Sequence, residues 1–155
     1  MSSDATSVIL DWTEAFNRHD PDAYAGYFSD DCVFTNVGTG RRLVGRAAAR
    51  QDFVDLLGAW SDLRLEVVNV LSADAGFTKE WIMTGVHAGD MPDLPATGRP
   101  FRIVGAGVGR IRDGRIVELT EYWNLADFLG QGGRLSAALE PRVRSDRTLT
   151  LVCSH

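Results

Sequence analysis

The dipeptide Asp113-Gly114 is the feature that most constrains the fold of this chain. Asp-Gly favours a two-residue β-turn because both central residues of such a turn need positive φ angles. Strand-like residues flank it, with the run 101–112 before the turn and a run beginning at Arg115 after it. Two further long runs, 63–71 and 77–87, precede this hairpin. The second half of the sequence therefore predicts a sheet of long antiparallel strands.

The first half of the sequence is mainly helical. Trp12 and Phe16 belong to an apolar stripe at helical spacing, and Pro21 ends that helix because proline disfavours helical backbone in the residue before it. Helices followed by long strands predict an α+β domain with the helices on one face of the sheet. The predicted elements of this half are a helix that begins after Asp4 or Ser7, a short helix capped by Asp20, strands 32–36 and 41–44, and a helix from about 46 to 60.

Glycines at positions 105, 107 and 109 alternate along the strand 101–112. Glycines inside a strand mark either a sharp bend or a place where a ligand approaches the backbone, and both interpretations remain open. A sheet bent in this way can curl around the helices and enclose an apolar pocket, with the Gly- and Pro-rich segment 88–100 at its mouth. Residues 1–135 are then expected to form one domain, followed by a tail, 136–155.

The composition argues against several functional classes. A net charge of −5, with no concentrated run of Lys and Arg, disfavours nucleic acid as a partner. No apolar run approaches the roughly 20 residues that span a bilayer, and residues 1–6 lack the features of a signal peptide. Cys32 and Cys153 lie far apart, so free thiols and a cytoplasmic location are expected. The three histidines are scattered, and no metal site is expected.

Glu121 is the strongest candidate for a catalytic group. Strand alternation places it on one face with Val117, Leu119 and Trp123. A carboxyl group among apolar neighbours is desolvated, which raises its pKa toward the range useful for general acid/base catalysis. The alternative is an outward-facing surface glutamate paired with an arginine.

The register of the last hairpin decides where Glu121 lies. A strict two-residue loop places it opposite Ala106, whereas a three-residue loop with a bulge places it opposite Gly107. We favour the second register, because the glycine row then clears space for a ligand beside the carboxylate.

Further candidates surround this predicted pocket. His87 ends a strand beside the loop 88–100 and could orient a substrate carbonyl or relay a proton; the alternative is a hydrogen bond to the loop backbone. Asn36 could bind a substrate oxygen or stabilise the turn that follows it. Large side chains that are expected in the core, some of them also lining the pocket, are Trp12, Phe16, Phe53, Trp81, Met83 and Trp123.

Four segments of the sequence form a recognisable set: Ala15-Phe16-Asn17, the strand end 85–89 (GVHAG), the loop 94–99 (LPATGR) and the hairpin 110–117. Together they resemble the SnoaL-like polyketide cyclases, which belong to the superfamily of ketosteroid isomerase and nuclear transport factor two. The resemblance covers about residues 7–133. It implies a cone-shaped α+β barrel, a homo-oligomer such as a dimer or tetramer, and no cofactor.

The resemblance also assigns roles to residues. The acid/base of the family is an aspartate seven residues after the glycine of the hairpin turn, and that position is Glu121 here. A family histidine seven residues before the same glycine is replaced by Gly107, whereas the other strand-end histidine is retained as His87. The reaction that the family implies is an intramolecular aldol closure of the last ring of an aromatic polyketide, as in antibiotic biosynthesis.

The leading hypothesis is therefore a cofactor-independent cyclase or isomerase that acts on a small hydrophobic carbonyl compound. Glu121 would remove an acidic C–H proton, and His87 or a backbone group would stabilise the enolate. A limonene-epoxide-hydrolase-like enzyme is the main alternative, and it would need a second buried carboxylate and a bridging arginine. The third possibility is a non-catalytic binding protein, which an outward-facing Glu121 would favour.

Overall fold

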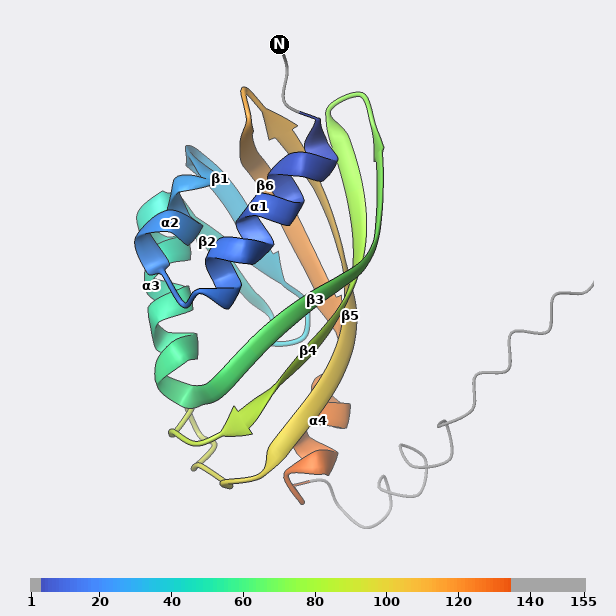
Figure 1. The fold of residues 1–155 in the computed structure, drawn as a ribbon. Coiled ribbons are helices and arrows are strands. Elements are labelled where there is room, and N and C mark those ends of the chain that lie inside the picture. Colours follow the sequence, from blue (N-terminus) through green and yellow to red (C-terminus); the bar gives the residue numbers. More distant parts are fainter. Residues whose placement is uncertain (1–3, 135–155) are drawn as a thin grey trace, which may run out of the picture.

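The structure is a computed structural model that describes residues 4–134, so the predicted tail 136–155 and Cys153 lie outside the described residues. The described residues form four helices and six strands (Figure 1). The helices are α1 (Ala5–Asn17), α2 (Pro21–Gly26), α3 (Arg46–Ala59) and α4 (Leu125–Gln131). The strands are β1 (Phe28–Asn36), β2 (Arg41–Val44), β3 (Trp60–Ala73), β4 (Gly76–His87), β5 (Pro100–Arg112) and β6 (Arg115–Trp123).

All six strands form one sheet in the order β2-β1-β6-β5-β4-β3. The predicted α+β class is confirmed, but the sheet is mixed, because β1 pairs with β6 in parallel while the other neighbours are antiparallel. A hairpin turn specifies antiparallel pairing locally. Most of the described chain lies between β1 and β6, so no turn of this kind indicates their pairing.

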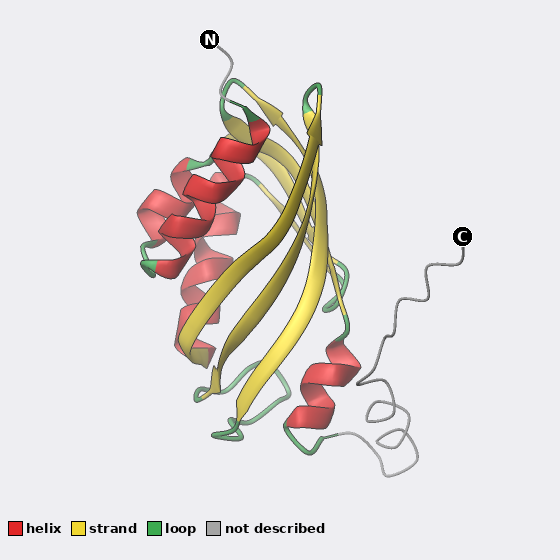
Figure 2. Cartoon of the chain, turned by 45° about the vertical axis from the view of Figure 1, so that its right-hand side comes forward, coloured by secondary structure: helices red, strands yellow, loops and turns green. Residues whose placement is uncertain are grey.

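The long strands curve around the N-terminal helices (Figure 2). Helix α1 packs against β3 and β4, while α2 and α3 pack against each other and against β1. Helix α4 packs on β5 at the far end of the molecule (Figure 1). The sheet is not closed, so the molecule has the form of an open cone with helices on its concave side.

Local signals set the ends of the first two helices. The side chain of Asp4 accepts a hydrogen bond from the backbone N–H of Thr6, and the side chain of Asp20 accepts from Asp22 and Ala23. The structure thus selects Asp4 over Ser7 as the first cap.

No helix of the described residues is long and apolar enough to cross a membrane.

The last hairpin adopts the favoured register. Asp113 and Gly114 both have positive φ angles, of 52° and 73°, as this turn requires. A register shift between Arg110 and Ile111 then places Glu121 opposite Gly107. The predicted pairing of Glu121 with Gly107 is therefore confirmed, and it turns Glu121 toward the concave face. The predicted three-residue loop is wrong, because Arg112 pairs with Arg115 around a two-residue loop and the bulge lies farther along the strands.

An aromatic cluster joins the three helices on the concave side of the sheet. The ring centroids of Phe53 and Tyr24 lie 4.2 Å apart, those of Phe53 and Phe16 4.9 Å, and those of Trp12 and Tyr24 5.3 Å. Such contacts join α1, α2 and α3 into one layer, which forms one wall of the site described next.

Candidate functional site

A cavity of about 1080 Å³ lies between the helices and the concave face of the sheet. It is slightly larger than the range of about 300–1,000 Å³ that is usual for small-molecule sites. The predicted site residues that line it are Glu121, Trp12, Phe16, Asn36, Phe53, Trp81, Met83 and Trp123.

Glu121 is buried and held at both carboxylate oxygens. Oε2 accepts a hydrogen bond of 2.7 Å from the indole Nε1 of Trp81, and Oε1 lies 2.7 Å from Nζ of Lys79. The carboxylate is therefore fixed in the cavity wall by one neutral and one cationic donor. The alternative prediction of an outward-facing surface glutamate is wrong.

Lys79 is a site residue that the sequence analysis missed. Its side chain is 1% exposed, and Nζ lies 4.0 Å from the ring centroid of Trp12, in cation–π geometry. Burial lowers the pKa of Lys79, while the Coulombic attraction of Glu121 and the hydrogen bond to it oppose this shift. Strand alternation places Lys79 on the same face as Trp81, and this signal could have identified it.

Gly107 does not line the cavity. A Cβ atom at this position would lie 2.7 Å from Cε of Lys79 and 2.8 Å from Oε2 of Glu121. The space that we expected for a ligand beside Gly107 is thus occupied by the ion pair. Across the β4–β5 pairing, Gly105, Gly107 and Gly109 face Trp81, Lys79 and Phe77, so the glycine row makes room for side chains of the neighbouring strand.

His87 lies apart from Glu121, the other predicted catalytic residue. It is 2% exposed, packs on Phe128, and lines a separate cavity of about 10 Å³ rather than the main one. Its Nδ1 lies 3.3 Å from the hydroxyl oxygen of Thr97, and Nε2 has no hydrogen-bond partner among residues 4–134. Burial lowers the pKa of His87. The structure therefore does not bring His87 to the carboxylate.

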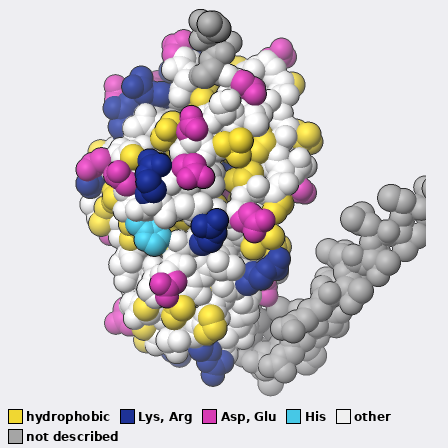
Figure 3. Space-filling model, in the orientation of Figure 1, with side chains coloured by type: hydrophobic (Ala, Val, Ile, Leu, Met, Phe, Trp, Pro, Cys, Tyr) yellow, Lys and Arg dark blue, Asp and Glu magenta, His cyan; other side chains and the backbone are white. Residues whose placement is uncertain are grey.

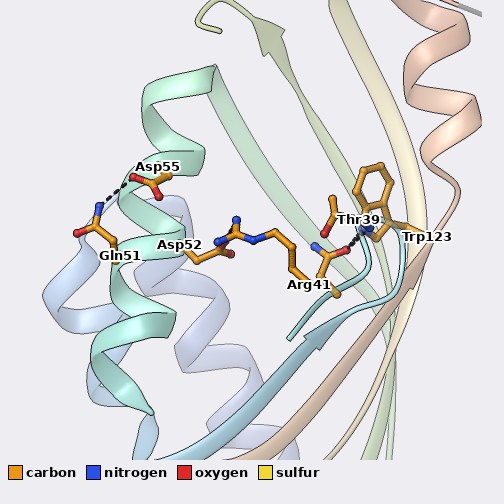
Figure 4. A network of polar contacts seen from close by, with 7 residues as sticks. Thr39, Arg41, Gln51, Asp52, Asp55 and Trp123 are labelled. Carbon is orange, nitrogen blue, oxygen red and sulfur yellow. Dashed lines mark hydrogen bonds and ion pairs between the residues drawn. The ribbon is translucent and has the colours of Figure 1, made fainter. Parts of the chain in front are cut away.

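Asn36 has the turn-stabilising role that was one of the two considered for it. Its Oδ1 accepts hydrogen bonds from the indole Nε1 of Trp123 (2.8 Å) and from the backbone N–H of Thr39 (3.1 Å). Figure 4 shows Trp123 beside Thr39, and both of them line the cavity together with Asn36. Asn36 thus stabilises its turn and fixes the orientation of an aromatic side chain that lines the cavity.

Arg41 and Asp52 form an ion pair at the solvent-exposed edge of the cavity. Arg41 extends from β2 toward α3, where it meets the carboxylate of Asp52 (Figure 4). The side chains are 54% and 21% exposed. Burial raises the pKa of Asp52, and the charge of Arg41 opposes this effect. Asp52 is a second carboxylate in the cavity, but its arginine does not bridge to Glu121, whose partners are Lys79 and Trp81.

The cavity also contains donors without acceptors. The indole Nε1 atoms of Trp12 and Trp60 are buried and have no hydrogen-bond partner within the described range 4–134, and both residues line the cavity. Buried N–H groups are rarely left unpaired, so these two favour a ligand with oxygen acceptors. No group of three or more His, Cys, Asp or Glu side chains in the same range could hold a metal ion.

The curved sheet, the helices on its concave side and the cavity between them define the ketosteroid isomerase-like fold. The model of the SnoaL-like polyketide cyclase family matches residues 6–132. The chain therefore belongs to the SnoaL-like polyketide cyclase family, as the sequence motifs predict. No curated protein matches the sequence.

Solved structures share the fold at low sequence identity. A candidate polyketide cyclase from Xanthomonas campestris is 26% identical, with a TM-score of 0.72 over 83% of this chain and 96% of that chain. AclR, a candidate hydroxylase from Streptomyces galilaeus, is 23% identical, with a TM-score of 0.73 over 84% and 96%. An LEH-like epoxide hydrolase from M. tuberculosis is 18% identical, with a TM-score of 0.67 over 83% and 88%.

Proposed function

We propose that this protein is a cofactor-independent cyclase or isomerase that acts on a small, hydrophobic, polyketide-like carbonyl compound by acid/base chemistry. The observation that carries the proposal is the carboxylate of Glu121, which is buried in the wall of a large aromatic cavity. Membership of the SnoaL-like family supports an intramolecular aldol closure of the kind used in antibiotic biosynthesis. We further propose a cytoplasmic location, where the buried thiol of Cys32 stays reduced.

In the proposed reaction, Glu121 removes a proton from a carbon next to a substrate carbonyl. The electrons of the broken C–H bond move to the carbonyl oxygen and form an enolate. The enolate carbon then attacks a second carbonyl carbon, and the resulting alkoxide takes back the proton from Glu121. The aldol closure needs no other reactant, and one carboxyl group can serve first as base and then as acid.

The cavity wall supports a flat, oxygen-bearing substrate. Its apolar lining includes the rings of Trp12, Phe53 and Trp123, which can stack on fused aromatic rings. The unpaired indole N–H groups of Trp12 and Trp60 can donate to substrate oxygens. Binding in this environment also excludes water, which would otherwise protonate the enolate.

The variant Glu121→Gln tests the proposal. Glutamine keeps the shape and can still accept from Trp81, but it cannot take up a proton. We expect ring closure of an aromatic polyketide methyl ester, followed by its absorbance, to slow by about 10²–10⁴-fold. Binding, followed by quenching of tryptophan fluorescence, should persist. The matched control is Glu118→Gln, because Glu118 is exposed on the other face of β6, where it pairs with Arg110. Turnover that survives in Glu121→Gln would disprove the mechanism.

Epoxide opening is a second candidate, favoured by the carboxylate of Asp52 and by the likeness to the M. tuberculosis epoxide hydrolase. In that reaction Asp52 and Glu121 would activate a water together. The same variants, with Asp52→Asn added, distinguish the two functions when they are assayed on limonene oxide. Epoxide hydrolysis that either substitution abolishes would favour this candidate over ring closure. The non-catalytic alternative loses its main support, because Glu121 faces inward.

A further inference from the structure

Lys79 is the single lysine of the chain, since the other 15 of the 16 basic residues are arginines. Arginine carries a delocalised, permanently charged group, whereas lysine carries a compact ammonium that exchanges its proton when buried. Among residues 4–134, Lys79 is also the one basic side chain that is buried in the cavity wall. An arginine could also neutralise Glu121, so a purely structural counter-ion would not need to be a lysine.

The ammonium group of Lys79 has hydrogen-bonding capacity to spare. It has three N–H donors. Glu121 Oε1, at 2.7 Å, is its one recorded polar partner among residues 4–134, and the ring of Trp12 covers one side. Lys79 lines the cavity but is 1% exposed, so a ligand oxygen reaches the remaining donors when the side chains that cover the ammonium move aside. The indole N–H of Trp12, which has no hydrogen-bond partner in the described part of the chain, belongs to the same part of the cavity wall.

We propose that Lys79 is a second catalytic residue, whose ammonium binds the carbonyl oxygen of the substrate and stabilises the enolate that Glu121 forms. The inference rests on the proposed function of Glu121. When the C–H bond breaks, its electron pair moves to the carbonyl oxygen, and the ammonium donates a hydrogen bond to that oxygen. The proton stays on Glu121 until the alkoxide takes it back. Lys79 keeps its own three hydrogens, and no other reactant is needed.

The surroundings of Lys79 suit this task. An ionic donor in a site with little water interacts more strongly with a developing negative charge than it would in bulk solvent. Burial lowers the pKa of Lys79, which makes its ammonium a stronger acid and a better donor to an enolate. The open position opposite, at Gly107, leaves room for Cε of Lys79, so the side chain can extend into the wall.

The test uses a coloured mimic of the enolate, 4-nitro-1-naphthol, whose ionised and neutral forms absorb at different wavelengths. Titration of the bound dye gives its pKa in the site without any turnover. We expect the dye pKa to be lowest in Glu121→Gln, where the ammonium lacks its anionic partner, intermediate in the unaltered protein, and highest in Lys79→Gln. The ionisation constant should differ by about ten-fold or more between the unaltered protein and Lys79→Gln. Trp12→Phe should shift it in the same direction by less.

Two further variants keep the test decisive. Loss of Lys79 alone leaves a buried carboxylate unpaired, which can prevent folding. The double variant Lys79→Met/Glu121→Gln removes both charges, and its bound dye should have a pKa above that of Glu121→Gln. Lys79→Arg keeps the charge but carries a group too large for the space beside Gly107. It should not restore the unaltered dye pKa.

The outcomes separate the two proposals. Equal dye pKa values in the unaltered protein and in Lys79→Gln, or in the double variant and Glu121→Gln, would overturn the assignment of Lys79. Failure of the unaltered protein to bind the ionised dye would overturn it too. A covalent adduct of Lys79 with a ketone after borohydride reduction would also overturn it, because the lysine would then act as a nucleophile. If the dye shifts occur but no carbonyl substrate is turned over, the oxyanion site stands and the proposed reaction fails.

Discussion

At the scale of single residues, the missing side chain of Gly107 has the largest consequence for the site. We expect Gly107→Ala to fold, because the flexible end of Lys79 can move away from the new Cβ. The crowding should cost about 1–3 kcal/mol in the free energy of unfolding. Turnover should fall with it, because Glu121 shifts together with its partner. Chemical denaturation and kcat measure the two effects.

The control for this substitution is Gly26→Ala, because no atom lies within 4 Å of a Cβ built at position 26. That variant should keep the kcat of the unaltered protein, and its free energy of unfolding should change by at most about 0.5 kcal/mol. If Gly107→Ala is as stable and as active as Gly26→Ala, the ion pair does not depend on the glycine.

Residues of the site differ in how far the sequence reveals them. Glu121 was identifiable, because alternation on β6 and the turn at Asp113-Gly114 together fix its direction. Lys79 was not singled out, because a lysine on a strand usually keeps its charged end in water. Asp52 was also missed, because an aspartate on a helix usually faces the solvent, whereas this one lines the cavity. Alternation does place Lys79 on the inner face, but the burial of its charged end there depends on Trp12 and Glu121, which no local pattern brings to it.

At the scale of elements, His87 links the end of β4 to the following loop and to α4. Its backbone pairs with Arg99 and Gly98, and its ring packs on Phe128. The ring is buried with Nε2 unpaired, which disfavours its charged form. His87 is thus in a position to couple the docking of α4 to pH.

Because the pKa of His87 is lowered by folding, the unfolded chain binds a proton more readily than the folded one. The stabilisation by neutral His87 is therefore complete above its ordinary pKa of 6.5 and is lost as the pH falls below this value. We expect the Tm of the protein to fall more steeply between about pH 7 and about pH 5 than that of His87→Leu. Parallel Tm curves for the two proteins would show that His87 does not titrate on unfolding.

The elements themselves were largely predictable, and the exception has a physical reason. Strands 63–71, 77–87 and 101–112 lie within β3, β4 and β5, because alternating apolar residues and turns define them locally. The strand predicted at 32–36 begins four residues earlier, at Phe28. That part of β1 pairs with β6 at Ile116 across a register irregularity, a contact between segments far apart in the sequence.

At the scale of the whole molecule, the convex face of the sheet carries exposed apolar side chains. Val104, Val108 and Tyr122 each expose about half of their surface. Figure 3, by contrast, views the molecule from the side on which α1 lies in front, and charges of both signs are interspersed there. We propose that the protein forms a dimer or tetramer through the convex face, because an apolar sheet surface of this kind is seldom left in water.

Sedimentation at micromolar concentration tests this proposal. We expect a species of at least two chains, and Val108→Asp should dissociate it, because a charge would be buried in the interface. The control is Leu10→Asp, because Leu10 is exposed on α1, which packs on the other face of the sheet. A monomer at that concentration, or an assembly unaffected by Val108→Asp, would contradict the proposal.

The isolation of Lys79 has a practical consequence for the study of this protein. Amine-reactive reagents can modify only the N-terminus and this one side chain, which is 1% exposed in the folded state. Acylation of Lys79 therefore requires the cavity wall around it to move, and its rate reports the free energy of that local opening in the same way as the exchange of a protected amide. A ligand that fills the cavity will slow this acylation, so mass spectrometry of a single lysine becomes a binding assay for substrates whose identity is still to be found.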